Sequence, residues 1–283
     1  KSLTESKNRE FIKYRREWEE RPRRQSAGEF PLHIDLESTS VCNLRCTFCW
    51  ANAMRDQGGF LEIEIAQKVF NEGADYGLRA VKFNLRGEPL LHPYLPDIVQ
   101  YAKEMGIVDA FFNTNALLLD ETKATQLIEA GLDRLIVSVD GFEKEFYERF
   151  RIGSDFDTVV CNVRNLQLLK DSLGIDKPRV RVQTVRLPEI VPVLDQYRAF
   201  WAPIVDEVAC TDLQDISCVE EIEEYPWACP FLFQRMTILW DGTMLPCDRD
   251  LHIKYPLGNV DTSSIHKVWT GNLMTEMRQM HIA

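Results

Sequence analysis

The chain has 283 residues, of which 45% are hydrophobic and 27% are charged, and its 33 basic and 44 acidic residues give a formal net charge of −11. These proportions exclude a disordered, collagen-like or coiled-coil chain and fit one or two globular domains with a sizeable core. An acidic chain is a poor candidate for binding nucleic acid through phosphates, and no segment approaches the run of about 20 apolar residues that crosses a bilayer.

The segment 1–30 predicts a helical extension. Phe11, Tyr14 and Trp18 recur at helical spacing among basic and acidic residues, and Pro22 is expected to end the helix. We expect this amphipathic helix to pack on the barrel or on a partner, and a contact with a substrate phosphate is the alternative.

Residues 31–213 alternate short apolar runs with helical patterns. Six such β/α units predict a parallel sheet with right-handed crossovers, either doubly wound or curved into a partial (β/α)6 barrel. In both folds the chemistry lies at the C-terminal ends of the strands. The predicted strands are His33–Glu37, Ala80–Leu85, Ala110–Asn113, Arg134–Asp140, Arg179–Val185 and Glu207–Leu213, and the predicted helices lie near 62–76, 95–105, 121–130, 157–170 and 190–202.

Residues 214–283 predict a smaller second domain. The segments Gln234–Leu239 and Met244–Cys247 flank Asp241-Gly242, a pair typical of a β-hairpin turn. A final helix is expected over Ser264–His281. This part of the chain therefore predicts a hairpin followed by a helix.

Eight cysteines are distributed unevenly along the chain. An even number is compatible with four disulfides, but the length and the lack of a secretion signal argue against that interpretation. Three of them lie close together, directly after the first predicted strand, and three thiolates at this spacing can hold an iron–sulfur cluster. A structural zinc site is the alternative; it needs a fourth Cys or His, and the next one along the chain is His92. The cysteines are Cys42, Cys46, Cys49, Cys161, Cys210, Cys218, Cys229 and Cys247.

The stretch from Val41 to Trp50 resembles the signature of the radical S-adenosylmethionine (SAM) superfamily. Its Cys42, Cys46 and Cys49 follow the pattern CxxxCxxC, with the aromatic Phe48 before the last cysteine. The resemblance implies a partial barrel with a 4Fe-4S cluster, one of whose irons is chelated by the amino and carboxylate groups of SAM. Reduction of such a cluster by one electron cleaves SAM to methionine and a 5′-deoxyadenosyl radical, which abstracts a hydrogen atom from the substrate.

A second motif supports the same family. Arg86-Gly87-Glu88-Pro89 ends the second predicted strand and resembles the family's GGEP motif, whose backbone and acid hold the SAM amino group. Arg86 stands where the motif has its first glycine, which is a departure from the pattern. The resemblance places Asn113 near the SAM and substrate space, and Ser138 with Arg151 downstream as the pair that contacts the SAM ribose or carboxylate. A helix-surface ion pair is the alternative for Arg151. Gln183, on the fifth predicted strand, is expected to point into the same mouth of the barrel.

Cys229 and Cys247 resemble the start of a SPASM or twitch domain, the auxiliary-cluster module of many radical SAM enzymes. The segment 230–246 separates them, and Gly242 lies shortly before the second. The resemblance implies a second 4Fe-4S cluster completed by two later cysteines. No cysteine follows Cys247, so either a C-terminal Cys-x-x-Cys is missing from the chain, which we favour, or Cys210 and Cys218 substitute.

Two enzymatic interpretations follow. A substrate radical can lose an electron to the auxiliary cluster, which gives an oxidation, or a thiol can return a hydrogen atom from the opposite face, which gives an epimerisation. Cys210 and Cys218 are the candidate hydrogen donors, with a buried structural role as the alternative for each. The general acid or base is not identified by spacing, although Asp140 and Asp212 lie near predicted strand ends.

The expected substrate is a small polyol such as a sugar, nucleotide sugar or aminocyclitol. The segment 1–41, which precedes Cys42, is too short for the leader-peptide-binding domain of many peptide-modifying relatives. A ribosomally made peptide is the alternative substrate, and an iron–sulfur electron carrier or redox sensor is the alternative of another class. The expected partners are the substrate and an external electron donor such as flavodoxin or ferredoxin, and oxygen-sensitive clusters with free thiols favour a reducing cytoplasm.

Overall fold

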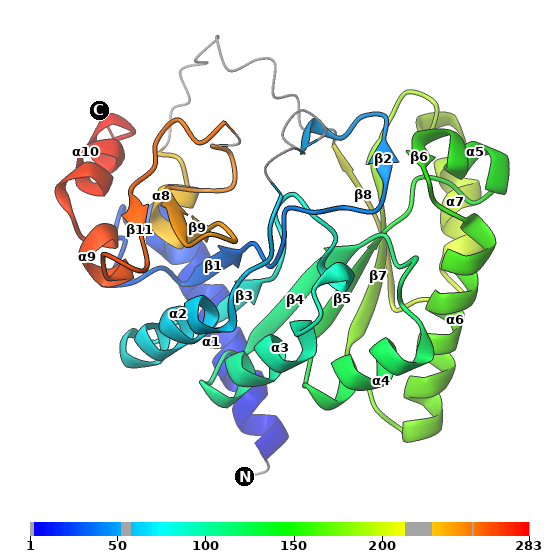
Figure 1. Ribbon diagram of the computed structural model, residues 1–283, viewed down its shortest axis with the longest axis horizontal. Coiled ribbons are helices and arrows are strands. Elements are labelled where there is room, and N and C mark those ends of the chain that lie inside the picture. The colour runs from blue at the N-terminus through cyan, green and yellow to red at the C-terminus, as the bar shows by residue number, and fades with distance from the viewer. Residues whose placement is uncertain (1–2, 52–57, 213–227, 251, 283) are drawn as a thin grey trace.

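One curved sheet of nine strands organises the protein (Figure 1). The computed structural model describes residues 3–51, 58–212, 228–250 and 252–282. Six parallel strands follow one another across the sheet without reversal, which is the order of a barrel and not of a doubly wound sheet. These strands are β1 (His33–Leu36), β3 (Ala80–Lys82), β4 (Asp109–Thr114), β5 (Arg134–Ser138), β7 (Arg179–Arg186) and β8 (Glu207–Asp212).

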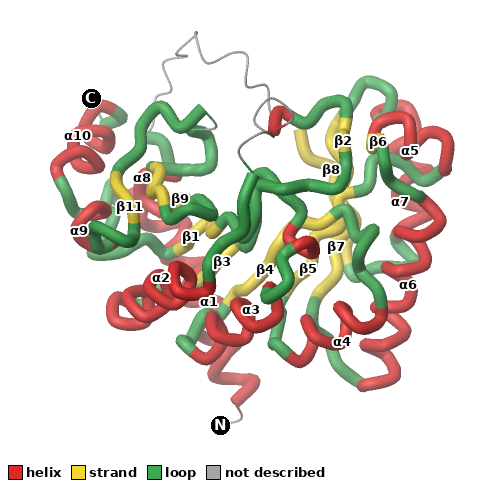
Figure 2. Tube along the Cα trace, in the orientation of Figure 1, coloured by secondary structure: helices red, strands yellow, loops and turns green. Residues whose placement is uncertain are grey.

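The predicted α/β fold is confirmed, and the barrel is partial. The second edge of β1 pairs with β9 (Arg235–Ile238) and not with β8, so β8 lies at one end of the sheet. Helices cover the outer face of the curved sheet (Figure 2). They are α2 (Ile63–Tyr76), α3 (Leu95–Glu104), α4 (Glu121–Glu129), α6 (Phe156–Leu173) and α7 (Leu194–Trp201).

The main core fills the space between this outer face and the helices. Alternate strand residues such as Leu36, Phe83 and Phe112 join helix residues such as Val69 and Val163 in one buried apolar cluster. Because side chains alternate along a strand, the intervening residues lie on the concave face. The concave face therefore carries polar strand residues such as Asp35, Asn113 and Gln183.

Helix α1 (Leu3–Arg23) packs at the N-terminal end of the strands. Its Tyr14 forms a small buried cluster with Leu32 and Ala80, and the ring of Trp18 contacts that of His33 edge-on, with 5.6 Å between centroids. The helix ends one residue after Pro22, close to the predicted end. The predicted helical extension is thus packed on the sheet.

The C-terminal hairpin continues the main sheet. Strand β9 lies parallel to β1, and β10 (Thr243–Leu245) returns antiparallel to β9 across the predicted turn, where Gly242 has a φ of +83°. A two-residue strand, β11 (Gly258–Asn259), completes that edge. The hairpin prediction is confirmed. The parallel pairing of β9 with β1 was not predicted, because no pattern in the local sequence indicates it.

The prediction of one final helix is wrong, because the segment forms α9 (Ile265–Trp269) and α10 (Asn272–Met280). Gly271 caps α10, and a Cβ on it would lie 2.8 Å from the carbonyl oxygen of Lys267. Arg278 donates from Nη1 to the carbonyl of Trp269 at 2.8 Å. Because the chain turns between the two helices, Arg278 of α10 can donate a hydrogen bond to the carbonyl group of the last residue of α9.

Short elements escaped the sequence analysis because they span too few residues for a period to emerge. Within the described ranges, no helix is both long and apolar enough to cross a membrane. The short elements are β2 (Arg45–Cys46), α5 (Lys144–Phe150), β6 (Arg151–Ile152), α8 (Phe231–Gln234) and the 3-10 turns Pro89–Leu91 and Val191–Val193.

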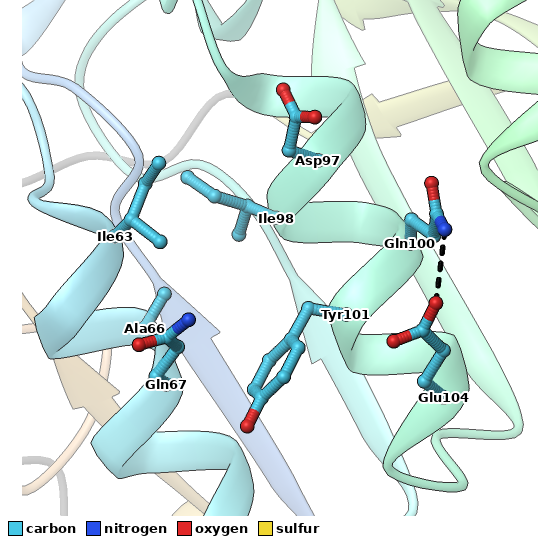
Figure 3. Close-up of a pocket in the computed structure, with 8 residues that line it drawn as sticks. All are labelled: Ile63, Ala66, Gln67, Asp97, Ile98, Gln100, Tyr101 and Glu104. Carbon is cyan, nitrogen blue, oxygen red and sulfur yellow. Dashed lines mark hydrogen bonds between the residues drawn. The ribbon is translucent and has the colours of Figure 1, made fainter.

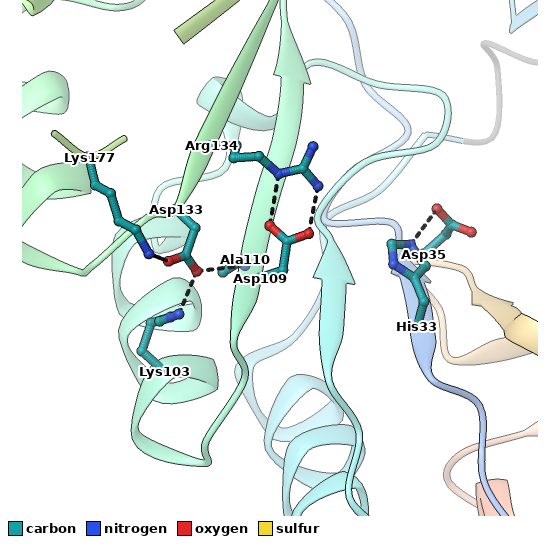
Figure 4. A network of polar contacts seen from close by, with 8 residues as sticks. All are labelled: His33, Asp35, Lys103, Asp109, Ala110, Asp133, Arg134 and Lys177. Carbon is teal, nitrogen blue, oxygen red and sulfur yellow. Dashed lines mark hydrogen bonds and ion pairs between the residues drawn. The ribbon is translucent and has the colours of Figure 1, made fainter. Parts of the chain in front are cut away.

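A buried carboxylate organises the N-terminal ends of the central strands (Figure 4). Asp133 accepts hydrogen bonds from Lys103 Nζ at 2.5 Å, from the backbone N–H of Ala110 at 2.8 Å and from Lys177. It therefore ties α3, β4 and the entry to β7 around the start of β5.

Replacing Asp133 with Ala is expected to destabilise the fold without touching the C-terminal ends of the strands. The change removes the acceptor of the Ala110 N–H and a largely buried ion pair with Lys103, which costs about 2–3 kcal/mol and lowers Tm by roughly 4–10 °C. Thermal unfolding followed by circular dichroism measures the change. Asp195→Ala is the control, because that side chain is fully exposed beside Arg198 and its loss is expected to leave Tm unchanged. Equal melting of the two variants would contradict the assignment.

Candidate functional site

Three thiols gather in the loop that follows β1, at the C-terminal end of the sheet. Cys46 lies on β2, and the charges of both Cys42 and Cys49 act on it. Burial raises the pKa of Cys46 to about 11 and also raises that of Cys42. Among the described residues, no three His, Cys, Asp or Glu side chains converge as ligands of a single ion.

The cysteine loop is held by a two-stranded ribbon. Strand β2 pairs antiparallel with β6, so that Cys46 lies opposite Arg151, and Thr47 donates its N–H to the carbonyl of Phe150 at 2.9 Å. The guanidinium of Arg151 lies 3.9 Å from Cys46 Sγ and 5.8 Å from the ring centre of Phe48. The structure therefore brings Arg151 and Phe48, both predicted site residues, to the cysteines.

Asp140 anchors Arg151 from the side of the sheet. The Nε and Nη2 atoms of Arg151 contact Asp140 Oδ2 at 2.7 and 2.6 Å, and Asp140 Oδ1 accepts from Thr184 Oγ1 and the N–H of Val185. Burial would lower the pKa of Arg151, but the charges of Asp140 and Cys46 hold it above its ordinary value. Asp140 is thus a buried, fully engaged carboxylate, whereas Asp212 is exposed and pairs with Arg186.

Gly87 allows the loop after β3 to lie directly against the cysteine loop. A Cβ on Gly87 would come within 2.2 Å of the carbonyl oxygen of Thr39 and 2.6 Å of that of Val41. The next residue, Glu88, donates its N–H to the Val41 carbonyl at 2.8 Å. Only glycine permits this approach, which is a physical reason for the glycine that the motif resemblance singled out.

Glu88 joins the loops that follow β3 and β4. Its buried carboxylate accepts hydrogen bonds from Thr114 Oγ1 at 2.6 Å, from the N–H of Asn115 at 2.7 Å and from the N–H of Leu90 at 3.1 Å. Burial raises the pKa of Glu88 even though these donors oppose the shift. The carboxylate therefore has a structural role in the described residues, and its direct contact with SAM stays a prediction.

Asn113, Ser138 and Gln183 lie on the concave face near the C-terminal ends of their strands. Ser138 pairs in register with Gln183, and all three side chains alternate with core residues. Asn113 Oδ1 is buried and has no hydrogen-bond partner among the described residues. An amide oxygen in this position can accept a hydrogen bond from a ligand, so the residues present fit a polar cofactor or substrate.

Arg86, the departure from the glycine motif, forms a buried ion pair with Glu37. Its Nε donates to Oε1 of Glu37 and its Nη2 donates to Oε2, both at 2.6 Å. Glu37 is fully buried and directly follows β1. The N–H of Trp240, in the C-terminal hairpin, approaches the same carboxylate at 3.4 Å. The pair therefore joins β1, the loop after β3 and the hairpin. Sequence analysis missed Glu37, although an acidic residue at the end of a buried strand is a usable signal.

Cys210 does not share the concave face with Gln183. It pairs in register with Thr184, whereas Gln183 pairs with Ala209, and its charge acts on the buried Tyr197 of α7. The helix-facing position does not support the predicted role of Cys210 as hydrogen donor. Cys218 lies outside the described residues.

Cys229 and Cys247 form a second thiol site. Burial raises the pKa of Cys247 to about 12, and the charge of Cys229 adds to this shift. Cys247 Sγ accepts a hydrogen bond from the N–H of Arg249 at 3.4 Å. Strand β9 lies between these two cysteines in sequence, and β8 carries Cys210. In the sheet, five other strands lie between β9 and β8. The charge effect favours a pairing of Cys229 with Cys247. The substitution by Cys210 stays a prediction.

A surface groove elsewhere is not part of this site. It has a volume of about 230 Å³ and lies between α2 and α3, where Tyr101 and Gln67 face each other across it (Figure 3). Both helices cover the outer face of the sheet, away from the concave face. The candidate site is therefore the cysteine loop with the concave ends of β3, β4, β5 and β7.

Replacing Gly87 with Ala is expected to displace the two loops, because the new methyl group overlaps the carbonyls of residues 39 and 41. We expect at least a tenfold loss of SAM affinity, measured by equilibrium binding to the anaerobically reconstituted protein. Gly174→Asn is the control, since Gly174 is a left-handed helix cap and a Cβ added to it would meet nothing within 4 Å, and Asn tolerates that conformation. Unchanged binding by the Ala variant would refute the close approach.

Replacing Arg86 with Gly restores the family motif but leaves Glu37 buried without its partner. We expect a loss of about 3–5 kcal/mol in stability. Exchanging Glu37 for Leu in the same chain is expected to recover a large part of that loss, because the unpaired charge is then removed. A double-mutant cycle of unfolding free energies measures the coupling, and additive effects of the two changes would show that the pair contributes nothing.

Comparisons with known proteins agree with this geometry. The radical SAM superfamily model matches residues 36–172, and that of the SPASM iron–sulfur cluster-binding domain matches residues 229–283. A protein named "Probable GTP 3′,8-cyclase" from Methanococcus maripaludis is 34% identical over 125 residues, which cover 44% of this chain and 41% of that protein. The chain thus matches about two-fifths of the length of that curated relative.

Two solved structures share the fold. BtrN in complex with AdoMet and 2-DOIA has a TM-score of 0.59 at 18% identity, covering 90% of this chain and 88% of BtrN. Streptococcus suis SuiB bound to the precursor peptide SuiA has a TM-score of 0.71 at 16% identity, covering 88% of this chain and 67% of SuiB. At these identities the likeness establishes the architecture of the chain alone.

Proposed function

Because the chain belongs to the radical SAM superfamily and carries a SPASM iron–sulfur cluster-binding domain, we propose that it oxidises a small polyol by removing a hydrogen atom from a carbon that bears a hydroxyl group. The observation that carries this proposal is the second thiol site, Cys229 and Cys247, which lie before and after a hairpin that continues the barrel sheet through β1. A second cluster site next to the barrel suits an oxidation, which needs an electron acceptor.

The residues for the first half of the reaction lie at the mouth of the barrel. Cys42, Cys46 and Cys49 would hold the 4Fe-4S cluster, which together with SAM supplies the 5′-deoxyadenosyl radical. Arg151 places a buried positive charge beside Cys46, and Gly87 keeps the neighbouring loop close enough to contact a ligand on the cluster. An external flavodoxin or ferredoxin would deliver the reducing electron.

Oxidation of a secondary alcohol to a ketone removes two electrons and two protons. One electron and one proton leave together as the hydrogen atom that forms 5′-deoxyadenosine. The second electron requires an acceptor, which Cys229 and Cys247 would hold, and the hydroxyl proton passes to a base or to water. An epimerisation would instead need a thiol on the concave face, and Cys210 faces the helices.

The polar side chains on the concave face support a polyol substrate. Asn113, Ser138 and Gln183 offer amide and hydroxyl groups, which suit hydrogen bonds with hydroxyl groups of a substrate. BtrN, which the chain covers over nearly its full length, is bound to 2-DOIA in its structure. The second candidate is oxidation of a peptide, favoured by the higher TM-score to SuiB bound to a precursor peptide.

The decisive experiment is the iron and sulfide content of the complete gene product after anaerobic reconstitution. We expect about eight irons, falling to about four when Cys42, Cys46 and Cys49 are all replaced with Ala. That variant is expected to lose all 5′-deoxyadenosine formation. About four irons falling to none would remove the electron acceptor, and zinc in place of iron would overturn the assignment.

A substrate panel separates the two candidates. Aminocyclitols, sugars and nucleotide sugars are assayed beside peptides for stimulated 5′-deoxyadenosine formation and for a product that is lighter by two hydrogen atoms. A response to peptides alone would exclude the polyol proposal.

A further inference from the structure

We propose that Arg235 is the positioning residue of the second cysteine site and that its positive charge raises the reduction potential of the cluster bound there. This inference rests on the proposed function, because it assumes a cluster at Cys229 and Cys247. It concerns a residue outside both cysteine motifs.

Arg235 connects that site to the barrel through two carboxylates. Its Nη1 atom contacts Asp248 Oδ2 at 2.9 Å and Asp35 Oδ2 at 3.1 Å. Asp248 directly follows Cys247, and Asp35 is fully buried on β1. One guanidinium thus holds the residue beside a thiol ligand against the strand that leads to the first cysteine loop.

Aromatic rings fix the guanidinium from other directions. Its carbon lies 4.6 Å from the ring centre of Phe231 and 5.3 Å from that of Trp18. Phe231 is two residues after Cys229, so Arg235 contacts a near neighbour of each cysteine. Stacking on rings is a contact that a planar guanidinium makes well and an ammonium makes less well.

The charge of Arg235 acts on the thiol site itself. The guanidinium lies beside this site, because it contacts Asp248, which directly follows Cys247, and Phe231, which is two residues after Cys229. The arginine side chain is 15% exposed, so solvent screens this charge only weakly. A fixed cation at a cluster favours the reduced, more negative state and raises the potential.

Two polar atoms of the Arg235–Asp248 pair have no hydrogen-bond partner among the described residues. They are Arg235 Nε and Asp248 Oδ1, and both are buried. Burying such groups is unfavourable unless something satisfies them. A donor and an acceptor at this position are therefore available to whatever binds at Cys247.

Asp35 also depends on Arg235. Burial alone would raise the pKa of this carboxyl, but Arg235 and His33 hold it below its ordinary value. His33 Nε2 lies 3.2 Å from the other carboxylate oxygen. Loss of the arginine charge would leave Asp35 and Asp248 as two neighbouring carboxylates on the barrel side of the cysteine pair, which makes the surroundings more negative.

The test compares Arg235→Gln and Arg235→Lys with Arg134→Gln as the matched control. Arg134 also pairs with a buried carboxylate, Asp109, at 2.8 and 2.7 Å and stacks on Phe111 at 3.8 Å, but it lies four strands from β9. Each change is made in the full chain, once in the natural sequence and once with Cys42, Cys46 and Cys49 replaced with Ala, so that the auxiliary cluster can be titrated alone by electron paramagnetic resonance.

We expect Arg235→Gln to lower the midpoint potential of the auxiliary cluster, or to lose its iron, while Arg235→Lys retains the iron and stays near the original potential. Arg134→Gln is expected to change neither. Full iron at an unchanged potential in Arg235→Gln would overturn the proposal, as would equal iron loss in the Gln and Lys variants. If the variant in which only Cys42, Cys46 and Cys49 are replaced with Ala binds no iron, there is no auxiliary cluster and the proposed function fails. That outcome is distinct from a failure of the role proposed for Arg235.

Discussion

The pairing of β1 along both of its edges is the constraint on which the rest of the structure depends. β1 donates and accepts backbone hydrogen bonds with β3 on one side and with β9 on the other, in parallel register on both. The chain leaves β1 directly into the first cysteine loop, and β9 lies between the two cysteines of the second site. This one short strand therefore sets the spatial relation between two sites that are far apart in sequence.

Buried ion pairs surround this strand and its neighbours. Asp35 on β1 pairs with Arg235, and Glu37, directly after β1, pairs with Arg86. The pair of Asp140 with Arg151 lies beside the first cysteine loop. Removing paired charges from water is expensive, and apolar residues would often be equally stable in such positions. The pairs are nevertheless directional, and each one joins segments from different parts of the chain. Their value here lies in fixing the loops that carry the cysteines and glycine of the site.

Sequence alone identified the parts of the molecule that are governed by local pattern. The cysteine spacing, the six strands and the Asp241-Gly242 turn depend on residues that are close in sequence. The partner of Arg86 could not be predicted in this way, because Glu37 lies on another strand, far away along the chain. The pairing of β9 with β1 was likewise invisible, since a hairpin pattern specifies its own turn and not the strand beside it. The face of Cys210 was missed because register, and not composition, decides which side of a sheet a residue occupies.

The two ends of the barrel part of the sheet differ in how firmly their strands are held. Near β1 the strands are buried, hydrogen-bonded on both edges and tied to a hairpin, whereas the residues of β8 are half-buried or exposed and pair along one edge only in the described part of the chain. Local opening requires little free energy where few buried contacts are lost. We therefore expect local opening of the sheet at β8 before β1. A substrate that needs more room on the concave face would gain it at β8, and the distance between the two thiol sites would not change.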